Sequence, residues 1–214
     1  MLATATTSTT VLSSPEHHPH PCIHISFVAA SHPLTRMSAA TTLTHLFSFV
    51  AASYPLAPSQ AVAKLGWKAP TLIQRHTIRE ALAGRDVLAR ARTGSGKTAA
   101  YALPMLHQIL RDKAREGGRR VTVGLVLVPT KELSRQTGRT LREIARFCAR
   151  DIAIADVSGG KQLKAQRAAL KDRPDVVVGT PAQVRAHVDS GAVDLSASLR
   201  TLVIDEADLV FSYG

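Results

Sequence analysis

The sequence has few cysteines, no long apolar run and a shortage of acidic residues. Its two cysteines, Cys22 and Cys148, are too few for a secreted disulfide framework and lack the spacing of metal ligands. Cys148 falls on the apolar side of an expected helix, which favours a buried, reduced thiol. No stretch approaches the roughly 18 consecutive apolar residues of a membrane-spanning helix, so we expect a soluble chain without a membrane segment.

The acid shortage leaves a strongly basic chain. Lys plus Arg number 27 against 16 Asp plus Glu, which gives a formal charge of +11 in 214 residues. Such a balance favours a polyanionic partner, nucleic acid first, although a solvated basic surface alone is compatible with it.

Residues 1–47 differ in composition from the rest. They are rich in Ser, Thr, Ala, Pro and His, with Glu16 as the only acid and Arg36 as the only Arg or Lys. We expect a disordered, low-complexity extension. A Ser/Thr-rich, acid-poor N-terminus also fits an organelle transit peptide, although the scarcity of Arg weakens a mitochondrial one. Residues 26–34 recur as 48–56 with one change, and the true start could be Met1 or Met37.

From residue 58 onward the pattern becomes that of a globular domain. Apolar runs indicate strands over 87–89, 121–128, 152–157, 175–178 and 199–204. Helical patterns lie between them, and a charged, glycine-containing loop is expected over 112–120. The alternation predicts an α/β fold, a doubly wound parallel sheet with helices on both faces. The loops that follow the strands then share the carboxyl edge of the sheet.

The segment 86–98 carries the strongest chemical pattern. A short strand leads into a glycine-bearing turn, followed by Lys97, Thr98 and a helix. Gly94 and Gly96 let the backbone curl around phosphate oxygens, Lys97 can reach the terminal phosphates, and the Thr98 hydroxyl can ligate Mg²⁺. Ala91 stands where the general pattern has its first glycine, and the alternative is an ordinary Gly-rich turn.

A second anchor follows the last expected strand. Asp205 stands where a carboxylate can hold Mg²⁺ opposite the phosphate loop, and Glu206 can orient or deprotonate an attacking water. An exposed acidic turn is the alternative. The pairing with the loop a hundred residues upstream favours a catalytic site of Lys97, Asp205 and Glu206, with Thr98 and Asp205 as metal ligands.

Together these motifs resemble the first RecA-like domain of DEAD-box RNA helicases over residues 49–214. Residues 66–74 resemble the family's Q motif, which implies that Gln74 reads the adenine edge and that Phe49 stacks on the base; Phe27 competes for the stacking role. The resemblance implies ATP and Mg²⁺ as cofactors and makes Ala91 a family feature. The nucleotide-binding residues it implies are Phe49, Gln74, Ala91, Arg92, Thr93, Gly94, Ser95, Gly96, Lys97 and Thr98.

The resemblance extends to RNA-backbone contacts. The implied RNA-binding residues are Pro129, Thr130, Lys131, Gly159, Gly160, Thr180 and Pro181. Lys131 stands where the family usually has Arg, so a charge contact survives but bidentate geometry does not. Gln183 also replaces a usual Arg. Lys131 and Thr180 could instead simply start helices.

The implied function is an ATP-dependent RNA helicase, in which RNA-stimulated ATP hydrolysis is coupled to local unwinding or remodelling. Residues 89–92 and 208–214 resemble the subgroup acting on the large ribosomal subunit, which implies a nuclear, nucleolar location; an organelle is the alternative. We expect residues 48–214 to form an incomplete RecA-like domain, truncated at its C-terminal end and without the second RecA-like domain. A truncated, catalytically incompetent ATP- and RNA-binding module is therefore the alternative function. A different P-loop ATPase fits the segment around Gln74 less well.

Overall fold

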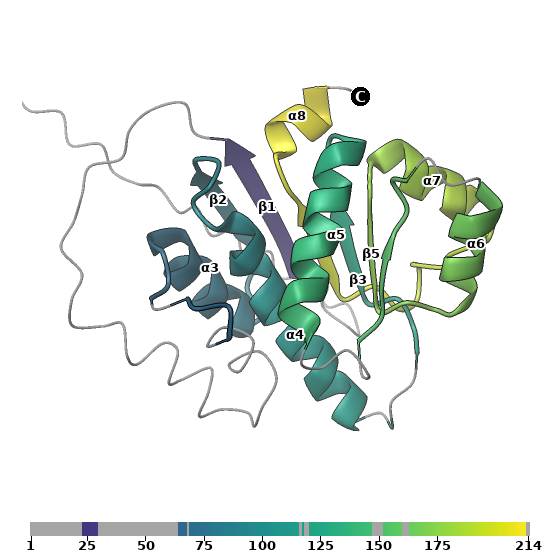
Figure 1. Cartoon of the computed structure of the whole chain (residues 1–214). Coiled ribbons are helices and arrows are strands. Elements are labelled where there is room, and N and C mark those ends of the chain that lie inside the picture. The colour runs from purple at the N-terminus through teal and green to yellow at the C-terminus, as the bar shows by residue number, and fades with distance from the viewer. Residues whose placement is uncertain are drawn as a thin grey trace, which may run out of the picture.

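A six-stranded, all-parallel sheet forms the centre of the computed structural model (Figure 1). The structure describes residues 23–29, 64–67, 69–115, 117, 120–146, 152–159 and 163–212. The strand order is β2-β1-β6-β3-β5-β4. The strands are β1 (Ile23–Ala29), β2 (Val87–Ala91), β3 (Gly124–Leu127), β4 (Ile154–Asp156), β5 (Val176–Gly179) and β6 (Thr201–Ile204).

Helices connect the strands and cover both faces of the sheet. They are α3 (Leu72–Leu82), α4 (Lys97–Arg115), α5 (Lys131–Ala145), α6 (Leu163–Lys171), α7 (Pro181–Asp189) and α8 (Ala207–Ser212). Strands alternating with helices require crossover connections, so the strands run parallel. The prediction of a parallel α/β sheet with helices on both faces is confirmed.

Alternate residues of the central strands feed two apolar clusters. Val126 of β3 packs with the buried sides of α3, α4 and α5. Its neighbour Leu125 points to the other face and packs with Leu170 of α6 and Val184 of α7. Because side chains alternate across a strand, a strand buried on both sides reads as a continuous apolar run, as β3 and β5 do. In the described part of the chain, no helix combines the length and apolar character needed to cross a membrane.

The structure corrects the expectation of disorder at one place in the N-terminal region. Ile23–Ala29 forms strand β1, which pairs with β2 through Ile25 and Val87 and with β6 through Ile23 and Thr201. The side chain of Ile25 is buried. Averaging composition over 47 residues hid a seven-residue run in which Ile, Phe and Val, all good strand formers, are frequent. The other residues of 1–47 lie outside the described part.

A second correction concerns the predicted loop over 112–120. Helix α4 continues to Arg115, because Asp112 and Lys113 remain on helical backbone and make ion pairs with Arg200 and Asp175. Charge alone suggested a loop, but these charged side chains lie on the side of the helix that faces the sheet. The predicted domain boundary near residue 48 falls outside the described residues.

Candidate nucleotide and RNA site

The phosphate loop joins the end of β2 to the start of α4. Gly94 and Gly96 adopt φ values of +75° and +87°, in the left-handed region that favours glycine. The Gly96 carbonyl accepts the Ala100 N–H and starts the helical hydrogen-bond pattern. Ser95 closes the turn by donating its hydroxyl to the Arg92 carbonyl at 2.7 Å. The predicted curl of backbone before a helix N-terminus is therefore present.

Gln74 braces this loop from α3. Its Oε1 accepts the Thr71 N–H at 2.9 Å, and its Nε2 donates to the Gly96 carbonyl at 3.2 Å. A Cβ at Gly96 would clash with the Gln74 amide. An amide group has two N–H donors and two acceptor lone pairs, so one of each remains beyond these bonds. That Gln74 reads adenine stays a prediction.

Lys97 and Asp205 bring opposite charges to one buried region. The Lys97 side chain is 7% exposed, and its Nζ lies 3.5 Å from the Ala91 carbonyl of its own loop. Burial raises the pKa of the Asp205 carboxyl, and the positive charge of Lys97 opposes that rise. Lys97 lies on the loop and helix that follow β2, Asp205 directly follows β6, and these two strands are separated in the sheet only by β1.

Tyr101 is a member of the site that sequence reasoning missed. Its side chain is fully buried, and its hydroxyl donates to Asp205 Oδ2 at 3.2 Å. The Thr98 and Thr137 hydroxyls also hydrogen-bond to it, while burial and the Asp205 charge raise its pKa well above the usual value. Tyr101 lies one helical turn after Lys97, and that i, i+4 spacing was the available signal.

Glu206 adopts an uncommon backbone conformation directly after Asp205. Its φ is +51°, in the left-handed region, which costs a non-glycine residue about 1 kcal/mol or more. Its backbone N–H donates to Asp205 Oδ1 at 3.0 Å. The turn thus fixes the Asp205 carboxylate, and the Glu206 side chain stays partly exposed.

The donor set suits Mg²⁺ bound together with a phosphate. Among the described residues, no group of three or more His, Cys, Asp or Glu could hold a metal ion alone. Mg²⁺ commonly uses one or two protein oxygens and completes its shell with substrate phosphates and water. The Thr98 hydroxyl and the Asp205 carboxylate, linked through Tyr101, fit that requirement.

The predicted RNA-binding residues that the structure describes follow β3, β4 and β5 along the same edge. Thr130 caps α5, because its Oγ1 accepts the Leu133 N–H at 3.2 Å. Lys131, the first residue of α5, is exposed. Thr180 makes no capping bond to the backbone and donates instead to Gln183 Oε1 at 3.2 Å. Capping of a helix N-terminus therefore explains the hydrogen bond of the Thr130 side chain, but it does not explain that of the Thr180 hydroxyl.

Several other predicted site residues are either exposed or lie outside the described part of the chain. Phe49 and Gly160 lie outside the described residues. Arg92 and Thr93 are exposed on the phosphate loop, and Pro181 is exposed at the start of α7.

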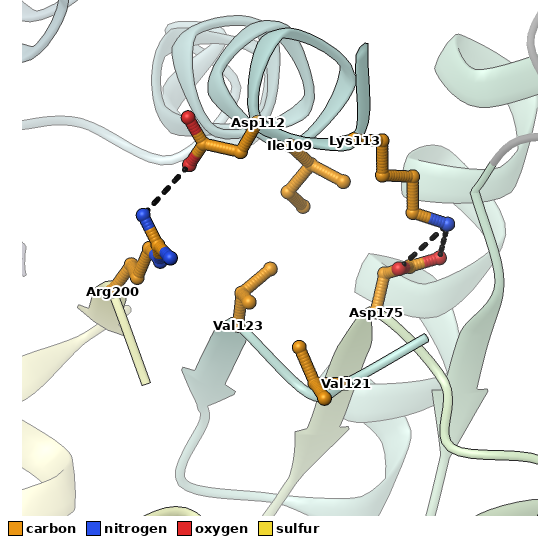
Figure 2. A pocket seen from close by; sticks show the side chains of 7 residues that line it. All are labelled: Ile109, Asp112, Lys113, Val121, Val123, Asp175 and Arg200. Atoms are coloured by element: carbon orange, nitrogen blue, oxygen red, sulfur yellow. Dashed lines mark hydrogen bonds and ion pairs between the residues drawn. The ribbon is translucent and has the colours of Figure 1, made fainter. Parts of the chain in front are cut away.

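A small pocket lies at the opposite, amino edge of the sheet (Figure 2). The Lys113 ammonium lies 2.8 and 2.9 Å from the two carboxylate oxygens of Asp175, and Arg200 lies 3.5 Å from Asp112. The remaining lining residues are Ile109, Val121 and Val123. Each cation faces a carboxylate, so the arrangement ties the end of α4 to the starts of β5 and β6 instead of offering charge to an anion.

Comparison with known proteins agrees with this geometry. The family model described as DEAD/DEAH box helicase matches residues 71–214. The chain is 47% identical over 155 residues to the ATP-dependent RNA helicase dbp9 of Aspergillus terreus, covering 72% of this chain and 25% of the relative. The Neurospora crassa relative, ATP-dependent RNA helicase dbp-9, is 48% identical over the same length, covering 72% of this chain and 23% of the relative. The chain thus spans about a quarter of these curated relatives.

Solved structures show the same fold. A hypothetical ATP-dependent RNA helicase from Sulfolobus tokodaii superposes with a TM-score of 0.63 at 40% identity, covering 73% of this chain and 43% of that one. A DEAD box protein from Methanococcus jannaschii gives 0.66 at 29% identity, covering 75% and 41%. The fold is therefore the RecA-like fold predicted from the motifs. With its phosphate loop, its Asp205–Glu206 turn and a family match over two thirds of its length, the chain belongs to the DEAD/DEAH box helicase family.

Proposed function

We propose that this chain supplies the ATP-binding half of an ATP-dependent RNA helicase, in which RNA-stimulated ATP hydrolysis drives local RNA unwinding or remodelling. The observation that carries the proposal is the convergence of Lys97 and Asp205 beside a glycine loop that starts a helix. Buried opposite charges at a helix N-terminus suit a nucleotide polyphosphate with its cation.

Each residue of the site then has a defined task. The backbone N–H groups of the phosphate loop and the Lys97 ammonium bind the phosphates. Thr98 and Asp205 would hold Mg²⁺, which would neutralise charge that develops on the phosphate oxygens. Glu206 orients the attacking water and accepts its proton. Gln74, braced against Gly96, carries adenine recognition.

RNA binding is assigned to the loops after β3, β4 and β5. Their position at the edge that also holds the phosphate loop supports this assignment, because the two ligands then lie on one side of the sheet. Contacts to sugar and phosphate give binding that is independent of sequence and weakened by salt. The likeness of residues 208–214 to the ribosome-assembly subgroup supports a role in nucleolar ribosome biogenesis.

The nucleotide part of the proposal is tested by titrating the chain with a fluorescent ATP analogue in Mg²⁺. The wild-type chain should bind, and Lys97→Ala should weaken binding at least tenfold, because one buried charge-assisted contact is worth about 1.5–3 kcal/mol. Arg115→Ala is the matched control, since it removes one positive charge from the exposed far end of the same helix.

The control separates a local effect at Lys97 from a general effect of losing one positive charge. Arg115→Ala should bind as the wild type does. Equal affinity of Lys97→Ala and wild type, or equal weakening in both variants, would show that the loop is not the nucleotide site.

A further inference from the structure

Two glutamines hold the backbone of the loop that follows β4. Gln166 of α6 donates its Nε2 to the Gly159 carbonyl at 2.6 Å. Gln183 of α7 donates its Nε2 to the Ser158 carbonyl at 3.5 Å. Consecutive carbonyls are thus held by side chains from the two helices that lie together at the right of Figure 1.

Each glutamine is itself held by a second side chain, from α7 or from the residue that precedes it. The Gln183 Oε1 accepts the Thr180 hydroxyl at 3.2 Å. The Gln166 Oε1 lies 2.8 Å from His187 Nε2. Because the Gln166 amide nitrogen is committed to Gly159, its oxygen faces the imidazole, so His187 must be the donor. Two series of hydrogen bonds therefore begin at Thr180 and His187, at and within α7, and end on the neighbouring carbonyls of Ser158 and Gly159.

The relay from His187 is buried. His187 is 1% exposed and Gln166 is 7% exposed. In the described part of the chain, His187 Nδ1 has no hydrogen-bond partner. That arrangement fits the neutral tautomer with its proton on Nε2, since a proton on Nδ1 would be buried without an acceptor. Burial, helped by Arg167, lowers the pKa of His187 in the same direction.

The loop is also fixed from its other side. The Ser158 N–H donates to Asp156 Oδ1 at 2.9 Å, and that oxygen also accepts the Ser134 hydroxyl at 2.8 Å. All described peptide bonds are trans, so the Gly159 N–H points away from the Ser158 carbonyl that Gln183 holds. Holding this carbonyl toward α7 therefore aims the Gly159 N–H away from α7.

We infer that Gln166 and His187 are positioning residues, which set the backbone of Ser158 and Gly159 for contact with an RNA phosphate. The inference rests on the proposed RNA-binding function and adds two residues to it. A loop that served only to connect β4 to α6 could be held in place by apolar side chains. A buried hydrogen-bond network in which every bond is satisfied instead holds the backbone in one specific geometry. The relay also joins the Gly159 loop to α7, so it links two segments that are predicted to contact RNA.

The experiment compares binding of a labelled single-stranded RNA by the full chain and its variants. Gln166→Met keeps side-chain length but removes both hydrogen bonds, and His187→Phe removes the supporting donor. Both should bind RNA about five- to tenfold more weakly, with an unchanged salt slope, because the weakened contact comes from uncharged backbone groups and releases no counterion. Affinity for a fluorescent ATP analogue should be unchanged. His187→Gln, which restores a donor, should recover most of the RNA affinity.

Gln108 provides the matched control. Its Nε2 donates to the Ala81 carbonyl at 3.2 Å and its Oε1 accepts the Thr201 hydroxyl at 3.5 Å, so it makes the same kind of bonds in another part of the fold. Gln108→Met should leave RNA affinity at the wild-type value. Melting temperatures of all variants confirm that binding is measured on folded protein.

The outcomes separate this inference from the proposed function. Wild-type RNA affinity in both Gln166→Met and His187→Phe overturns the inference, as does an equal loss in Gln108→Met. A wild-type chain that binds the nucleotide analogue but no RNA contradicts RNA binding itself. Loss of both ligands in Gln166→Met, with a lowered melting temperature, shows a general structural role instead.

Discussion

At the scale of single residues, the proposed nucleotide site is a set of buried polar groups that satisfy one another. Asp205 receives hydrogen bonds from the Tyr101 hydroxyl and the Glu206 N–H while it faces the charge of Lys97. A carboxylate without these partners would be costly to bury. The tyrosine therefore stabilises the charged form of Asp205 that a metal ligand needs.

Tyr101→Phe tests this role, because it removes one hydroxyl and leaves the ring. We expect the free energy of unfolding to fall by about 1–2 kcal/mol through loss of buried hydrogen bonds. Nucleotide affinity should fall several-fold in Mg²⁺ and remain unchanged in EDTA, because the effect passes through the metal ligand. Titration of a fluorescent ATP analogue under both conditions measures it. An equal loss with and without Mg²⁺ would contradict the role.

Residues of the site could be predicted where their signal is local. Gly94, Gly96, Lys97 and Thr98 form one short pattern whose geometry follows from the loop itself. Tyr101 carried only the weak signal of its i, i+4 spacing from Lys97, because its partner Asp205 is distant in the sequence. Gln166 and His187 gave no signal for the same reason: their hydrogen bonds exist only once α6 and α7 lie together.

At the scale of secondary-structure elements, β1 has the most consequence for the site. It separates β2, which leads into the phosphate loop, from β6, which leads into Asp205. Neighbouring strands lie about 4.8 Å apart, so one inserted strand keeps the two strands about 10 Å from each other. The relative position of Lys97 and Asp205 therefore depends on β1.

Ile25→Ala probes that dependence. Ile25 is 1% exposed, and truncating a buried Ile to Ala costs about 2–5 kcal/mol of unfolding free energy. Denaturant unfolding should show this loss, and nucleotide affinity should fall with it. Leu88→Ala is the control, since Leu88 pairs with Ser26 of β1 but is 41% exposed, and it should change both quantities little. Equal stability of Ile25→Ala and wild type would mean that β1 contributes nothing to the fold.

At the scale of the whole molecule, the alternation of apolar runs and helical patterns was enough to predict the parallel sheet. It could not predict the strand order, because β1 lies in a segment whose composition indicated disorder and pairs with strands that are distant in the sequence. The extent of α4 was also unpredictable, since its charged C-terminal turn is stabilised by Asp175 and Arg200 from the amino edge of the sheet.

The stability of the molecule should decline in mild acid. Burial lowers the pKa of His107, helped by Arg111, and that of His187, helped by Arg167, below the usual histidine value of about 6.5. Below about pH 6.5 the unfolded chain binds protons that the folded chain does not, so stability falls until the lowered pKa values are reached. The slope is about 1.4 kcal/mol per pH unit for each such group.

Denaturant unfolding between pH 8 and pH 5.5 measures this slope. The double variant His107→Gln, His187→Gln should have a flatter profile than the wild type over this range. Identical slopes would show that neither histidine stays neutral in the folded chain.

The central place of β1 also constrains when the sheet can be completed during synthesis. Among the described strands β1 comes first along the sequence, yet one of its two neighbours, β6, lies more than 170 residues later. Until residues 201–204 leave the ribosome, one edge of β1 has no partner, and the two sides of the future nucleotide site cannot be joined. Such pairing between distant segments folds slowly and leaves strand edges open to wrong partners in the meantime. A nascent chain of this protein should therefore depend on chaperones until β6 is released.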